Sequence, residues 1–206
     1  MALSTFTELK AALADWLDRT DLTSQIVDFI TLAEAEFNRT LLVPEREDAV
    51  TSSASSATIT LPTDFYALRS IYIDSDPKVF LQQMSFAELR TTYSASATGK
   101  PQNFALQSGN ELVLAPSPDA TYSLILNYYK TIPALSGSVA TNWLLTSHPD
   151  IYLFGSLAQA GDFLADDPRI PLWRGKLSQA SAELMRQGHF KAYGGAPLRI
   201  RAPYSV

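Results

Sequence analysis

The two histidines are the first residues whose chemistry could matter, because the chain has no cysteine to act as a nucleophile or to bind zinc. His148 and His189 stand far apart in the sequence, and neither belongs to a metal-ligand spacing such as H-x-x-x-H. Pro149 follows His148, an order typical of the N-cap and first turn of a helix. The histidines therefore predict a helix start at 148, with no metal site and no cofactor.

Two pairs of carboxylates are the next candidates, Asp74-x-Asp76 and Asp166-Asp167. Such a pair could hold a divalent cation or work as an acid/base couple. A proline directly follows each pair, and this order favours turns and helix starts. We expect both pairs to shape the backbone. An enzyme that acts through Asp74 and Asp76, with a metal-dependent activity, is the least favoured alternative, and the chain is expected not to be an enzyme.

Patterns that bind phosphate or activate a serine do not occur in the sequence. It contains no G-x-S-x-G, P-loop or G-x-G-x-x-G, and Gly194-Gly195 precedes Ala196-Pro197 instead of a helix start. The isoelectric point is near 5.0, and basic residues do not cluster in the part expected to fold. Specific recognition of DNA needs a basic face, so it is not expected here.

The aromatic residues in the middle of the chain allow two interpretations. They could form the floor of a carbohydrate site, which would make the protein a phage or bacterial β-domain that binds glycans. Core and cross-strand packing is the favoured interpretation, because it is the commoner use of such residues. The residues in question are Phe65, Tyr66, Tyr72, Phe80, Phe104, Tyr122, Tyr128 and Tyr129.

Charge is distributed unevenly along the 206 residues, although the net charge is only −5. Residues 1–48 hold ten acidic and four basic side chains, whereas residues 186–206 hold four basic side chains and no acidic one. A short basic tail on an acidic body is typical of a segment that docks on an acidic surface. The alternative is a solvated tail that binds nothing.

The elements that must position these residues begin with two amphipathic helices in the first 42 residues. Thr5-x-x-Glu8 is a capping-box pattern that opens the first helix, and the second should run from about Asp21 to Pro44. Each shows apolar residues at helical steps. The expected buried residues are Phe6, Leu9, Leu13 and Trp16 in the first helix, and Ile26, Ile30, Ala33, Phe37 and Leu41 in the second.

A β-rich block is predicted to follow, because β-branched and aromatic residues dominate several short runs. We expect strands at 58–62, 65–73 and 78–82 and a short helix at 85–93. Three later runs, separated by turns, predict a meander of three strands. These runs are 104–107, 111–116 and 122–130.

Helical spacing returns near the C-terminus. In the helix that begins at His148, the interior glycines Gly155 and Gly161 predict that a neighbouring element packs very close. A final helix should begin at Asp167 and stop at Gly188, because glycine is common just past a helix end. Its expected buried residues are Trp173, Leu177, Ala180 and Leu184. Beyond it, two glycines and two prolines predict an extended arm.

Together these elements predict an α+β fold. Residues 1–48 and 141–190 are expected to close one antiparallel four-helix bundle, because none of the four helices is long enough to be stable alone. Residues 49–140 would form an inserted β subdomain, and residues 191–206 a C-terminal docking arm. A content of 46% hydrophobic residues is enough for a core. The N-terminus lacks the features of a signal peptide, and no apolar run is long enough to span a membrane.

Two stretches resemble the head-to-tail adaptor (connector) proteins of tailed bacteriophages. They are PQNFALQSGNELVLAPSPDATYSLILNYYKTIPALS at 101–136 and TNWLLTSHPDIYLFGSLAQAGDFLADDPRI at 141–170. With the paired N-terminal helices, the likeness covers roughly residues 1–190. It implies a helical bundle with an inserted β domain, assembled as a ring, commonly of twelve copies, between the portal and the next tail or nozzle protein. Such a ring sits in the neck of the virion, is assembled in the host cytoplasm, and lets DNA pass without sequence-specific binding.

The C-terminal arm is the candidate partner-binding site, and with the resemblance the portal becomes its expected partner. Leu198 and Ile200 alternate with Arg199 and Arg201, a period of two that suits a strand added to another chain's sheet edge. The arginines would select an acidic border. The alternative is a frayed tail. The residues expected to make the contact are Phe190, Lys191, Tyr193, Leu198, Arg199, Ile200, Arg201 and Tyr204.

Overall fold

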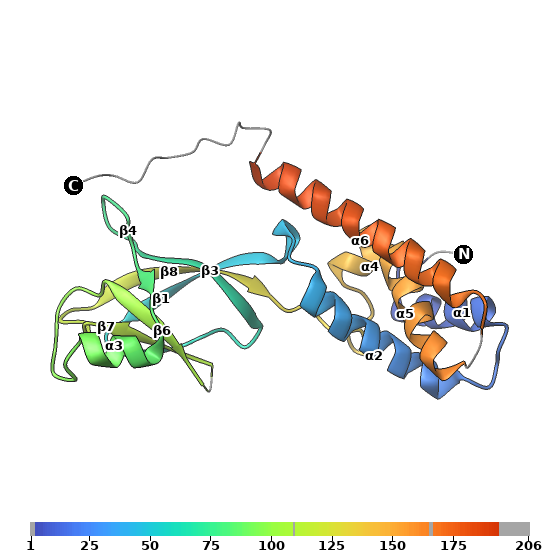
Figure 1. Ribbon diagram of the computed structural model, residues 1–206, viewed down its shortest axis with the longest axis horizontal. Coiled ribbons are helices and arrows are strands. Elements are labelled where there is room, and N and C mark those ends of the chain that lie inside the picture. Colours follow the sequence, from blue (N-terminus) through green and yellow to red (C-terminus); the bar gives the residue numbers. More distant parts are fainter. Residues whose placement is uncertain (1–2, 109, 165–166, 194–206) are drawn as a thin grey trace. The chain divides into compact units, whose positions relative to one another are not determined.

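The computed structural model describes residues 3–108, 110–164 and 167–193. The chain divides into two compact units, each continuous in space (Figure 1). The helical unit comprises Met1–Glu45 and Ile132–Val206, and the β unit comprises Arg46–Thr131. Helices and strands are thus segregated along the chain, which makes the fold α+β.

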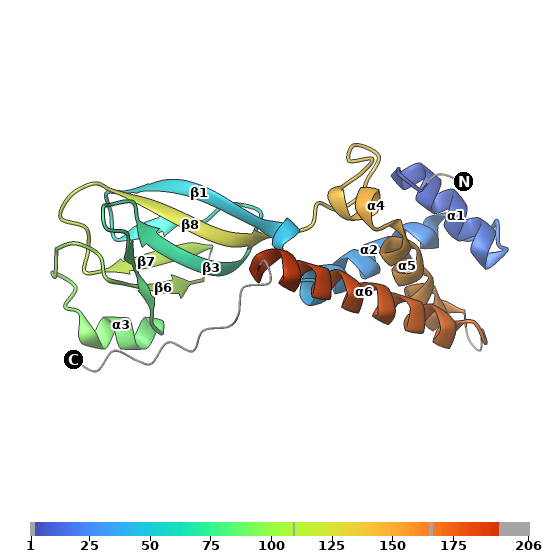
Figure 2. The ribbon, with the colours of Figure 1, turned by 90° about the horizontal axis from the view of Figure 1, so that it is seen from above.

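The helical unit is organised around one central helix, α5. The other helices of the unit, α1, α2, α4 and α6, all pack against it. In Figure 1 α5 lies between α2 and α6, and in Figure 2 it lies between α1 and α6. The bounds of these helices are Phe6–Leu17 (α1), Thr23–Thr40 (α2), Trp143–Ser147 (α4), Pro149–Phe163 (α5) and Ile170–Tyr193 (α6).

The predicted antiparallel four-helix bundle is wrong. The described residues form six α-helices and two four-stranded sheets. In a bundle each helix turns one apolar face to a shared core. Nearly every residue of α5 from Ile151 to Gly161 is instead buried, because apolar and small residues lie all around this helix. A helix that is apolar on every side belongs in the interior, with the other helices around it.

The N-terminal helices follow the sequence closely, with one exception. In α1 the capping box is confirmed, because Glu8 N–H donates to Thr5 Oγ1 (3.3 Å) and Thr5 N–H donates to Glu8 Oε2 (3.0 Å). All five apolar residues predicted for the buried face of α2 are buried. Trp16 is the exception, since 46% of it is exposed. Its ring meets the edge of Phe154 at a centroid distance of 5.8 Å.

Three helical glycines mark places where another segment packs closely. A Cβ atom on Gly155 would lie 2.7 Å from Phe37 Cε1, and one on Gly161 would lie 2.8 Å from Ile170 Cγ1. The close packing predicted for these two positions is therefore confirmed. Gly188, expected to end the last helix, is buried against Pro44 instead. The helix continues to Tyr193, so the prediction of an extended arm from residue 191 is wrong for its first three residues.

The β unit consists of two sheets that enclose a shared apolar core. One sheet has the strand order β1-β8-β3-β4, and the other has the order β2-β7-β6-β5. Core residues come from both, among them Ile71, Leu124 and Leu126 of the first sheet and Phe104 and Leu112 of the second. The bounds are Glu47–Ala54 (β1), Thr58–Thr60 (β2), Phe65–Ile73 (β3), Val79–Phe80 (β4), Gln82–Gln83 (β5), Asn103–Gln107 (β6), Glu111–Ala115 (β7) and Tyr122–Lys130 (β8).

The predicted three-strand meander is wrong in its last step. β6 and β7 form an antiparallel hairpin, but β8 crosses to the other sheet and lies between β1 and β3. Leu124, Leu126 and Tyr128, which share one face of β8, are buried there. The short helix α3, Phe86–Thr92, covers the outer face of the second sheet through Leu89, which packs on Ala105.

Among the helices that the structure describes, none has the length and apolar character needed to cross a membrane.

Candidate interaction surfaces

The residues singled out for chemistry lie at helix ends, in a turn or on the surface. His148 ends α4 and begins α5, with Pro149 as the first residue of α5, as predicted. Asp74 forms an ion pair with Lys78 in the turn between β3 and β4, and Asp76 precedes Pro77 there. His189 lies on the exposed surface of α6. The described residues contain no group of three or more His, Asp or Glu side chains placed to hold a metal ion.

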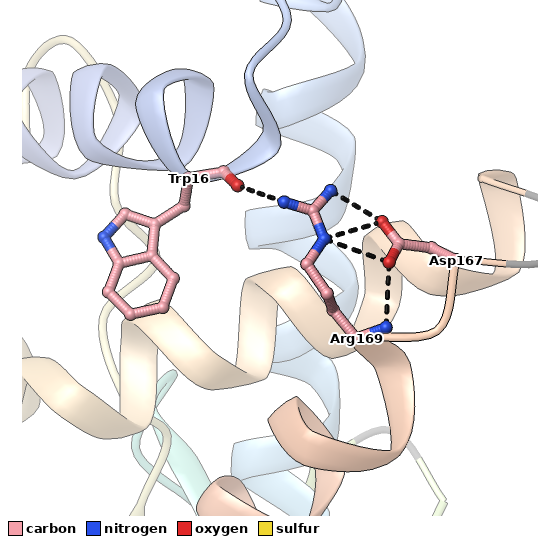
Figure 3. A network of polar contacts seen from close by, with 3 residues as sticks. All are labelled: Trp16, Asp167 and Arg169. Carbon is pink, nitrogen blue, oxygen red and sulfur yellow. Dashed lines mark hydrogen bonds and ion pairs between the residues drawn. The ribbon is translucent and has the colours of Figure 1, made fainter.

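Asp167 and Arg169 connect the start of α6 to the end of α1 (Figure 3). The Arg169 guanidinium donates to both carboxylate oxygens of Asp167, at 2.7 to 3.1 Å, and its Nη1 donates to the Trp16 carbonyl oxygen at 2.9 Å. The hydrogen bonds from Arg169 lower the pKa of Asp167. This carboxylate therefore stays ionised and fixes the turn that precedes α6, which is the structural role expected for it. Asp166, its predicted partner, lies outside the described residues.

A buried polar cluster lies where α2 meets the chain returning from the β unit. Glu34 is only 5% exposed, and its Oε1 accepts hydrogen bonds from Leu135 N–H (2.8 Å) and Tyr152 Oη (3.1 Å). Asn142 Nδ2 in turn donates to Tyr152 Oη (2.6 Å) and to the Pro133 carbonyl oxygen (2.7 Å). Burial raises the pKa of Glu34 and of Tyr152. The cluster fixes residues 133–142 within the helical unit.

The sequence interpretation missed this cluster, although one signal was present. Glu34 is four residues from Ile30, within the apolar stripe of α2, so the helical spacing places its carboxylate on the buried face. A charged group in that place needs hydrogen-bond partners.

Most of the aromatic residues named for the β unit pack against other side chains. Phe104 and Tyr128 are buried, and Phe65 stacks on Tyr128 at a centroid distance of 5.8 Å. Tyr72 and Phe80 face each other across β3 and β4, with ring centroids 5.1 Å apart. The predicted packing role is confirmed for these five residues.

The predicted partner-binding residues are divided by the end of α6. Phe190 is 71% exposed on the last turns of this helix, and Lys191 forms an ion pair with Glu45. Tyr193 is the last residue of α6. The remaining residues of the predicted site, Leu198, Arg199, Ile200, Arg201 and Tyr204, lie outside the described residues.

The edge of strand β1 is a second candidate surface. β1 forms one border of its sheet and pairs with β8 along its full length, from Glu47 opposite Tyr129 to Ala54 opposite Tyr122. A cavity of about 250 Å³ lies beside this edge, where the two sheets part. Its lining is mainly apolar and includes Val50, Ser52, Ile59, Leu61, Leu112 and Leu124.

Comparison with known proteins gives the context for these surfaces. No curated protein matches the chain. A family model described as SU10 adaptor protein matches residues 4–201, which is nearly the whole chain and includes both units. The resemblance to head-to-tail adaptors is thereby confirmed. The chain belongs to the SU10 adaptor protein family, a family of phage head-to-tail adaptors.

Proposed function

We propose that this protein forms a ring in the neck of the phage particle, below the portal, where it extends the DNA channel and seats the next tail or nozzle protein. The family match over residues 4–201 carries the proposal. An adaptor associates with other structural proteins of the virion and has a structural role. The ring, its twelve copies, its position below the portal and its assembly in the host cytoplasm are the finer parts of the proposal.

The charge of the N-terminal segment of the helical unit supports a role beside DNA. Residues 3–45 contain eight acidic and three basic side chains, and Asp15, Asp18 and Asp28 are exposed. A channel must let a polyanion slide, and each basic side chain on a phosphate adds affinity by releasing counterions. An acidic or neutral lining avoids that retention. The protein would therefore surround DNA without binding a particular sequence.

Exposed apolar side chains supply possible contacts between subunits. Trp16, Phe163, Leu172 and Phe190 are each about half exposed or more, and they are spread over α1, α5 and α6. Single exposed residues of this kind do not force association of a free chain. We expect the isolated protein to be a monomer and the ring to form with its partner, since binding to a partner stabilises the assembled state.

Co-expression with the portal protein tests this function directly. Analytical sedimentation of the chain alone at low micromolar concentration should show a monomer. The chain with the portal should sediment as one complex, and imaging of that complex should show a closed ring coaxial with the portal. A closed ring of the chain alone would contradict the requirement for a partner. A complex without a ring, or no complex at all, would refute the proposed function.

A further inference from the structure

β1 differs from the other strands that border the two sheets. The borders β2, β4 and β5 are two or three residues long, whereas β1 has eight residues in unbroken register with β8. An edge strand presents a row of unpaired N–H and C=O groups, which proteins protect with proline, lysine, bulges or very short strands. The sequence EDAVTSSA contains neither proline nor lysine. Among the described strands, β1 is therefore the long edge without these protections.

The core beside this edge is incompletely filled. Val50, Ser52 and Ala54 lie on the core-facing side of β1, and two of these three side chains are small. Ser52 stands opposite Leu124 of β8, so the apolar layer becomes thinner toward the border of the sheet. The 250 Å³ cavity lies at that border and is lined by side chains from both sheets. A further strand with apolar residues on one face would fill it.

We propose that residues 197–201 of a second copy add as a strand to the edge of β1, with Leu198 and Ile200 inserted into the cavity. Residues two apart in a strand point to the same face, so both would enter the core while Arg199 and Arg201 face solvent. The inference rests on the ring proposed above. It replaces the portal, expected from the resemblance, with the neighbouring subunit as the receiver of the arm.

Three observations favour this occupant. The segment alternates apolar and charged residues between Pro197 and Pro203, as an edge-adding strand requires. The family match extends to residue 201 and therefore includes Leu198 and Ile200. Four residues separate Tyr193 from Leu198, a span of about 17 Å in extended chain, so the arm can reach beyond its own helix end. Donor and acceptor are different surfaces, and such head-to-tail contacts form a ring when the rotation between neighbouring copies closes.

Disulfide cross-linking gives a clean test, because the chain has no cysteine of its own. One chain would carry Thr51→Cys or Ser53→Cys in β1, and a second chain would carry Arg199→Cys. The three residues are placed on the outward face of the extended sheet, so a close pair can form a disulfide. The chains are mixed, assembled with the portal, oxidised and separated without reductant. Gln83→Cys on the opposite border of the β unit is the matched control.

The expected result is a covalent dimer of the adaptor from the β1 variants, at least tenfold more abundant than with Gln83→Cys. Three results in an assembled ring would overturn the inference: no adaptor dimer, equal yields with the control, or a link from Arg199→Cys to the portal. An intrachain disulfide in a chain with both substitutions, without a link between chains, would equally overturn it. Failure to see any ring by imaging would instead refute the proposed function on which the inference rests.

Paired substitutions in the arm provide a second readout. Leu198→Asp with Ile200→Asp should lower incorporation into the ring at least tenfold, because carboxylates would enter the apolar cavity. Arg199→Gln with Arg201→Gln is the matched control and should change incorporation by less than threefold. Neither pair should shift the melting temperature of the free chain. Equal incorporation of the two variants would contradict the assignment of Leu198 and Ile200 to the core face.

Discussion

Glu34 has a carboxylate that folding places among apolar side chains, with Leu135 N–H and Tyr152 Oη as its hydrogen-bond donors. Burial favours its neutral form and raises its pKa above the usual 4.5. The folded chain therefore keeps this proton at pH values where the unfolded chain has already lost it. Stability linked to Glu34 is complete below pH 4.5 and is lost as the pH rises through the raised pKa.

Glu34→Gln should remove this loss of stability, because the amide oxygen can accept the same two hydrogen bonds without a charge. We expect the variant to gain stability relative to the natural protein as the pH rises from 4.5, until the gain becomes constant. Urea denaturation at a series of pH values, followed by the circular dichroism of the helices, measures the difference. If the stability of the two proteins changed with pH in the same way, Glu34 would not be the cause of the pH dependence.

Phe37 and Trp173 anchor the helical core, since both are almost completely buried. Replacing either by Ala should lower the free energy of unfolding by about 3 to 5 kcal/mol, through lost burial and the cavity left behind. Leu172→Ala is the control on the same helix, because Leu172 is 59% exposed and should cost at most about 0.5 kcal/mol. Denaturant titration of the three variants shows whether the two core variants lose more stability than Leu172→Ala. Unchanged stability of both core variants would refute the core assignment.

The sequence predicted the burial and contacts of individual residues best where the periodic pattern of one helix was enough to decide them. The buried face of α2 and the capping box of Thr5 and Glu8 were predicted correctly, because both depend on spacing within one helix. The burial of Trp16 was predicted wrongly, because the apolar stripe of α1 does not show how far other elements cover it. The partners of Glu34 could not be predicted either, because Leu135 and Tyr152 are distant in sequence.

At the scale of elements, the spacing of α2 and α5 depends on a missing side chain. Gly155→Ala would place a methyl group against the Phe37 ring, and such overpacking costs about 1 to 3 kcal/mol. Gly175→Ala on α6 is the matched control, because nothing lies within 4 Å of the added atom. There the better helix propensity of alanine should add about 0.5 to 1 kcal/mol. The melting temperature should therefore fall for Gly155→Ala and rise for Gly175→Ala. A shift of both variants in the same direction would contradict the close contact at Gly155.

The errors in predicting elements also have physical causes. Gly188 was taken as a helix end because glycine commonly follows one, but here the missing side chain lets α6 approach Pro44. β8 was assigned to a meander because short turns usually join neighbouring strands in one sheet. Its pairing with β1 was not predicted, since the sequence of β1 has few apolar residues and gives little periodic signal.

At the scale of the molecule, the chain enters the β unit through β1 and leaves it through β8, and these two strands pair with each other. Glu47 stands opposite Tyr129, and Arg46 Nε donates to the Lys130 carbonyl oxygen at 2.8 Å. The predicted division of the chain into an inserted β subdomain and a helical remainder can be tested by excision. We expect residues 46–131 alone to unfold cooperatively, since they enclose a core of their own.

Leu124→Ala in that fragment provides the control, because a fully buried leucine contributes about 2 to 5 kcal/mol. Its midpoint of denaturation should fall well below that of the unaltered fragment. Circular dichroism during urea titration measures both. A fragment without a cooperative transition, or one whose midpoint of denaturation does not change with Leu124→Ala, would show that the β unit depends on the rest of the chain.

The open edge of β1 also sets a limit on the unassembled protein. A long edge strand without proline or lysine is a template for another extended chain, and every copy of this protein carries the same edge. Free subunits at high concentration are therefore exposed to β-type aggregation, whose rate rises with their number and with the time they wait. Prompt incorporation into a particle would remove the hazard, so the supply of this protein must be matched to the supply of its partners.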